Sequence, residues 1–76
     1  MLDLGRTQIT NVGLNKLNRL TNLRTLHVNG TRISDEGLKE LPKLKNLRVV
    51  DLSNTQVTDA GVKELEELMP SLEIRR

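Results

Sequence analysis

The feature that most constrains this chain of 76 residues is a repeat of 24 positions. Apolar residues return at this interval, so three copies of one unit cover residues 2–25, 26–49 and 50–76. The main columns are Leu2, Leu26, Val50 and Ile74; Leu4, Val28 and Leu52; Ile9, Ile33 and Val57; Leu14, Leu38 and Val62; and Leu17, Leu41 and Leu65. A fixed period of this length indicates stacked units that share one continuous core. We therefore predict a single domain over residues 1–76.

Within each copy, local patterns predict a strand followed by a helix. Residues 26–29 alternate between apolar and polar, as on a strand with one buried face. Ser34 and Thr58 each precede an acidic residue, which predicts a helix with the hydroxyl as its N-cap. Pro42 disfavours helical geometry at the residue before it, so the second helix should be short. The third helix should extend to about Leu68.

The copies resemble leucine-rich repeats with the approximate consensus L-x-x-L-x-L-x-x-T-x-I-T-D-x-G-L-x-x-L. The resemblance is carried by residues 23–47 and 47–68, including Thr55, Val57, Thr58, Asp59 and Gly61. The copies are similar to the repeats of ribonuclease inhibitor and of bacterial proteins of that kind. The resemblance implies an α/β solenoid, with a parallel sheet on its concave face and short helices on its convex face. The columns Thr7, Thr31, Thr55 and Gly13, Gly37, Gly61 should then serve the turn and close helix packing.

Composition argues against several classes of function. The chain has no Cys and no aromatic residue apart from His27, so thiol chemistry, thiolate metal sites and base stacking are not expected. A net charge of +2 is too balanced for a nucleic-acid binder. No apolar run approaches the ~20 residues that span a membrane. We expect a cytoplasmic protein that uses no cofactor and binds neither nucleic acid nor membrane.

The outward strand positions are the candidate protein-binding face. Period and alternation place these residues there: Asp3, Arg6, Thr25, His27, Asn29, Val49, Asp51, Ser53 and Asn54. His27 should stand between Asp3 and Asp51, one strand spacing from each. This group is a solvated charge ladder, a set of contacts for a protein partner, or a metal or catalytic site. A hydrolytic triad is disfavoured because Ser53 should lie too far from His27 for a hydrogen bond.

The two ends of the array carry opposite charge. Residues 2–25 contain four basic and one acidic residue, whereas residues 50–76 contain three basic and six acidic residues. The first strand should be a bare sheet edge with a candidate self-association surface of Leu2, Leu4, Ile9 and Leu14. We expect a homo-oligomer. A closed dimer is favoured over head-to-tail stacking because the long helix and charged tail should cover the other end.

The resemblance implies a protein–protein interaction module rather than an enzyme, with a partner that the sequence does not identify. Such a module is expected to be part of a longer array or derived from one. The main alternative is a self-assembling structural unit that uses its uncapped N-terminal end. A weaker alternative, enzyme inhibition, rests on analogy of fold alone.

Overall fold

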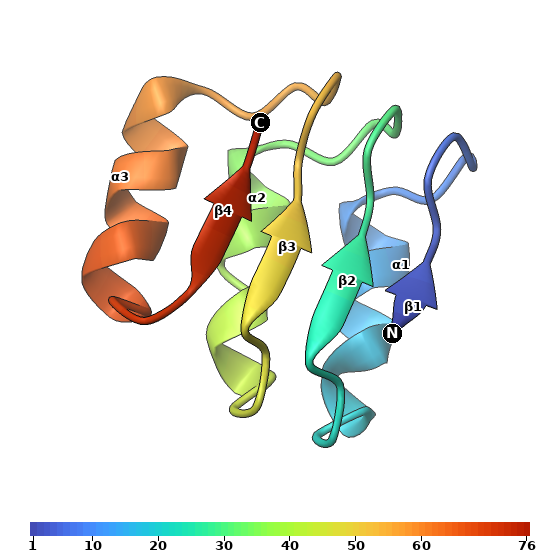
Figure 1. The fold of residues 1–76 in the computed structure, drawn as a ribbon. Helices are drawn as coiled ribbons and strands as arrows, with labels where there is room; N and C mark the ends of the chain where they lie inside the picture. Colours follow the sequence, from blue (N-terminus) through green and yellow to red (C-terminus); the bar gives the residue numbers. More distant parts are fainter.

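The computed structural model describes residues 1–76, in which strands and helices alternate along the chain (Figure 1). The strands and helices are β1 (Leu2–Asp3), α1 (Asn11–Asn15), β2 (Thr25–His27), α2 (Asp35–Leu38), β3 (Val49–Asp51), α3 (Asp59–Leu68) and β4 (Glu73–Arg75). Short 3₁₀ turns at Lys16–Arg19 and Leu41–Lys43 extend the first two helical segments. The helices lie on one side of the sheet and leave the other face open (Figure 1).

The four strands form one parallel sheet in the order β1-β2-β3-β4. Leu26 pairs with Leu2 on one side and with Val50 on the other, and Val50 pairs in turn with Ile74. Residues at the 24-residue interval therefore lie beside one another, as the sequence predicts. A parallel sheet with a helical connection between strands is the geometry expected of an α/β repeat solenoid.

Burial is greatest in the central copy. Leu26, Val28, Ile33 and Leu41 are completely inaccessible to solvent and belong to one apolar cluster. Their counterparts in the first copy are only partly buried, namely Leu2, Leu4, Ile9 and Leu17. In a stacked array each unit covers its neighbours, so the terminal units keep one side of the apolar stripe exposed.

The threonine column closes the turn that follows each strand. The hydroxyls of Thr7, Thr31 and Thr55 donate to carbonyl oxygens three residues earlier at 2.7, 2.6 and 2.7 Å. Each threonine hydroxyl oxygen also accepts the backbone N–H of the residue two positions later, at 3.4 to 3.5 Å. The hydroxyl thus replaces backbone partners where the chain leaves the sheet. The structural role predicted for these threonines is confirmed.

The helices begin where the sequence predicts, but only one of the two predicted capping hydrogen bonds forms. The Thr58 hydroxyl accepts the N–H of Gly61 at 3.3 Å and caps α3, which ends at Leu68 as predicted. Ser34 stands at the N-cap of α2, yet its side chain makes no capping hydrogen bond. Its hydroxyl instead accepts a hydrogen bond from Asn11 Nδ2 at 2.8 Å. The prediction of a hydroxyl cap was wrong for Ser34 because the preceding repeat takes that oxygen.

At the start of α1 and of α2, one side chain joins the repeat to the next. Asn11 accepts the backbone N–H of Ser34 at 3.0 Å. One period later, Asp35 accepts the N–H and the hydroxyl of Thr58 at 2.8 and 2.5 Å. These bonds lower the pKa of Asp35, with the Thr58 hydroxyl as the largest cause. We call each such pair a junction.

The glycine column leaves room for these junctions. A Cβ atom at Gly61 would collide with the carboxylate of Asp35, and one at Gly37 would collide with the amide of Asn11. A side chain at either position would have to displace the junction residue of the preceding repeat. The prediction that these glycines permit close helix packing is confirmed, and the group they accommodate is the junction side chain.

A second column has left-handed backbone geometry. Arg6, Gly30 and Asn54 share positive φ angles of 58°, 68° and 56° at the turn after the strand. Glycine adopts this region freely and asparagine tolerates it, whereas other L-residues incur a steric penalty. Arg6 is therefore the strained member of the column.

Replacing Arg6 with Gly should stabilise the chain by about 1 kcal/mol, since the steric penalty at positive φ exceeds the added entropy of the unfolded chain. Urea denaturation of the two proteins measures the difference. Gln8→Gly, on the same exposed turn but without positive φ, is the control and should not stabilise the chain. A loss of stability in Arg6→Gly would show that the arginine side chain makes a contact that outweighs the strain.

Candidate functional site

The open face of the sheet carries a row of ionisable side chains that crosses all four strands. Asp3 pairs in register with His27, His27 with Asp51, and Asp51 with Arg75. Acidic and basic positions therefore alternate along the row. The predicted position of His27 between two aspartates is confirmed. We call this set of four residues the charged row.

His27 and Asp51 form the centre of the row and are partly shielded from water. Their side chains are 23% and 22% exposed, and His27 Nδ1 lies 3.8 Å from Asp51 Oδ2. Ser53 donates to Asp51 Oδ1 through both its N–H, at 3.0 Å, and its hydroxyl, at 2.7 Å. These hydrogen bonds from Ser53 lower the pKa of Asp51, and the nearby His27 and Arg75 act in the same direction.

This geometry does not build a nucleophile. The Ser53 hydroxyl donates to a carboxylate on its own strand, so its proton is not directed toward the imidazole of His27. No group of three or more His, Cys, Asp or Glu side chains is placed to hold a metal ion. What the centre of the row does supply is a fixed carboxylate, because two hydrogen bonds from Ser53 hold Asp51 in one orientation.

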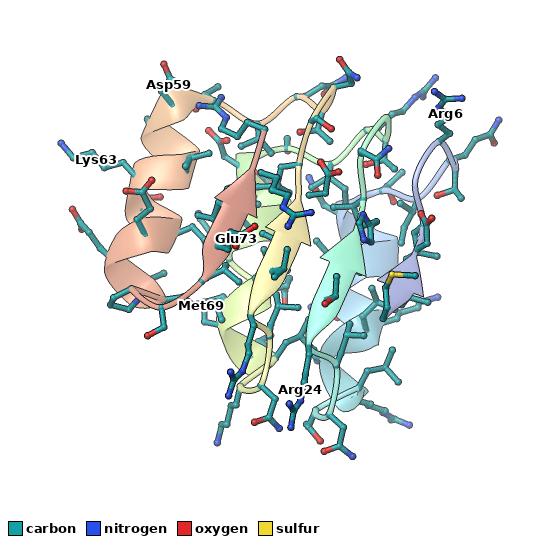
Figure 2. All side chains as sticks on the ribbon, viewed as in Figure 1. Arg6, Arg24, Asp59, Lys63, Met69 and Glu73 are labelled. Carbon is teal, nitrogen blue, oxygen red and sulfur yellow. The ribbon has the colours of Figure 1, made fainter.

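The remaining residues of the predicted face divide between the sheet and its rim. Thr25 and Val49 pair in register on β2 and β3 and are partly buried. Asn29 follows β2, and its amide lies against the backbone of Gly5. Arg6 and Asn54 were predicted on the strands but lie in the turns beyond them, where both have positive φ and are exposed. Figure 2 shows Arg6 at the rim of the sheet.

The sequence analysis did not include two residues of the face. Glu73 and Arg75 flank Ile74 on β4 and pair in register with Val49 and Asp51. Arg75 Nε donates to Glu73 Oε2 at 2.7 Å, and Figure 2 shows Glu73 on the open face of the sheet. The signal was available, because Ile74 belongs to a buried column and its two neighbours must then point outward.

The predicted self-association surface needs one correction. Leu2, Leu4 and Ile9 are partly buried, but Leu14 is only 2% exposed because α1 packs it into the core. The exposed apolar residues at this end are instead Met1, Val12 and Leu20, with 83%, 70% and 45% exposed. A hollow of about 420 Å³ lies between Met1 and Leu2 on one side and the segment 19–23 on the other. We call this region the β1 end.

No helix in the structure is both long and apolar enough to cross a membrane. A search of curated proteins gave no significant match. Residues 21–67 match the model of a family described as leucine-rich repeats in two copies. This span covers β2, β3 and most of the helical layer, and it contains most of the buried core residues. The chain belongs to the leucine-rich-repeat family.

Proposed function

We propose that this chain is a non-enzymatic protein-recognition module that binds its partner on the open face of the sheet. Leucine-rich repeats are in general protein-interaction modules. The observation that carries the proposal is the charged row, in which acidic and basic side chains alternate across four strands. Such a row favours a partner segment whose charges alternate in the opposite sense.

Photo-crosslinking tests which face binds the partner. A photoreactive amino acid at Val49 would lie on the open face, two residues before Asp51 on β3. One at Lys63 would lie on the exposed surface of α3 (Figure 2). We expect Val49, but not Lys63, to crosslink to a discrete partner in an extract of the source cells. Replacing Asp51 with Lys should reduce that crosslink. Equal crosslinking at both positions, or crosslinking only at Lys63, would contradict the proposal.

The β1 end supports a second candidate function, which is self-association. The exposed side chains of Met1 and Leu20 and a hollow adjoin an edge strand, and such surfaces are usually covered in small proteins. Two copies that meet through this end about a two-fold axis would form a closed dimer. The first repeat carries four basic residues and one acidic residue, so like charges would face each other.

Salt dependence tests this dimer. Added salt should strengthen the association, because at ~1 M the screening length falls to about 3 Å and repulsion between the basic ends is suppressed. Sedimentation analysis at several concentrations measures the mass. Leu20→Asp should weaken the dimer, and Leu68→Asp, at an exposed site on α3, should not. A monomer at every concentration and salt level would exclude the closed dimer.

A further inference from the structure

We propose that residues 73–76 cover a docking surface for the first repeat of a second copy of this chain. β4 and Arg76 occupy the place that the strand and the turn of a following repeat would take. When this segment is displaced, β1 of another copy fits beside β3, and copies join head to tail. The surface lies at the end of the sheet opposite the β1 end. The second copy would dock on it through its own β1 end, so this contact and the closed dimer are alternatives and the inference does not depend on the closed dimer.

The junctions within the chain define what the surface lacks. Asn11 binds Ser34 and Asp35 binds Thr58, in each case 23 residues further along. Asp59 is the third member of this column, at the start of α3 (Figure 2). Its side chain is 94% exposed, and its one hydrogen bond comes from Arg76. A guanidinium here stands in for the N–H and hydroxyl that a following repeat would supply.

β4 imitates β1 in the same way. Ile74 pairs with Val50 as Leu26 pairs with Leu2, and Leu2 precedes Ile74 by three full periods. The correspondence between β4 and β1 stops at Arg76, because the first copy has the apolar Leu4 at that position. Leu4 belongs to a column whose other members are buried. β1 of a second copy therefore offers the pairing of β4 and an additional apolar side chain.

The first repeat carries the complementary half of a junction. Thr10 holds the column position of Ser34 and Thr58, and no Asn or Asp side chain reaches it. Gly13 holds the position of Gly37 and Gly61, and a Cβ atom added there would meet only Ile9 of its own copy. The N–H and hydroxyl of Thr10 can thus donate to the carboxylate of Asp59, and Gly13 leaves the space for it.

Charge favours this contact over other arrangements. The first repeat has four basic residues and one acidic residue, whereas the third has an excess of acidic residues. Head-to-tail contact sets these opposite charges against each other, and it does not close unless it forms a ring. The docking partner is accordingly a second copy of this chain, presented through β1, Thr10 and Gly13.

The first test removes the covering segment. A chain that ends at Leu72 should associate progressively, with a weight-average mass that rises with concentration beyond that of a dimer. This mass should fall on adding salt, in contrast to the closed dimer, because opposite charges attract across the contact. Asp59→Lys in the shortened chain should abolish the growth. A folded shortened chain whose mass never exceeds that of the full chain would overturn the proposal.

The second test gives an answer even if the shortened chain does not fold. Residues 1–72 joined directly to residues 1–76 place Leu2 of the second copy at the sequence position of Ile74. Thr10 of the second copy then follows Asp59 by the same number of residues as Thr58 follows Asp35. This tandem should unfold in one transition at a higher temperature than the single chain. One residue inserted where the two copies are joined turns the side chains of the strand to the wrong face and should remove the increase in melting temperature. Equal melting of the two tandems would overturn the proposal.

Discussion

Replacing Leu41 with Ala should lower the free energy of unfolding by about 2 to 5 kcal/mol. Leu41 is completely buried in the central copy, where neighbouring repeats cover it from both sides. The surrounding leucines are held by strand register and by the junctions, so they cannot collapse fully into the cavity. Small domains have a total stability at the low end of about 5 to 15 kcal/mol, and the loss is a large fraction of it.

Thermal unfolding followed by circular dichroism measures this loss. The midpoint should fall by at least about 8 °C, given a shift of about 4 to 8 °C per kcal/mol in a domain of this size. The same substitution at Leu68, whose side chain is 63% exposed, is the matched control and should have little effect. A cooperative transition within a few degrees of the parent would show that burial of the Leu41 side chain is not a major source of stability.

Replacing Asp35 with Ala should cost about 1 to 2 kcal/mol, because Thr58 loses the acceptor of both its N–H and its hydroxyl. The carboxylate is partly exposed, so water replaces part of what is lost. Asp35→Asn should cost much less. The chain itself provides the precedent, since the amide of Asn11 makes the corresponding junction with Ser34.

The pH dependence of stability distinguishes the contribution of the Asp35 charge from that of its hydrogen-bonding shape. Hydrogen bonds from Thr58 lower the pKa of Asp35 in the folded state, so its stabilising contribution is present above the unfolded value of about 3.9. The contribution is lost as the pH falls through the lower, folded pKa. Urea denaturation from neutral pH to about pH 2 should therefore show a smaller acid loss for Asp35→Asn than for the parent. Identical pH profiles would mean that the carboxylate contributes no more than an amide.

The location of the open face and of its charged row could be predicted because it depends only on period and alternation. Asp3, His27 and Asp51 are separated by whole periods, so parallel pairing without slippage must place them side by side. Arg6 and Asn54 were placed less well, because the end of a strand depends on backbone angles rather than on side-chain alternation. Gly30 is the residue type expected at a left-handed turn, but Arg6 in the same column is not, so the column did not indicate positive φ.

The junctions could not be read from the sequence. Ser34 and Thr58 carry the same capping signal, but only Thr58 caps its helix. Which partner a hydroxyl selects depends on what the neighbouring repeat brings within hydrogen-bond distance, and that distance is set only after the repeats stack. The same reason explains why Leu14 was misplaced, since its burial is decided by how α1 folds onto the sheet.

By itself, the sequence determined the repeat length, the parallel order of the strands and the apolar columns that form the core. These follow from hydrophobic periodicity, which is local, repeated and therefore insensitive to the details of packing. Only the tertiary structure decided what Asp59 contacts at the start of α3. Arg76 donates a hydrogen bond to Asp59 because the folded chain brings together two residues 17 positions apart that no periodic pattern relates.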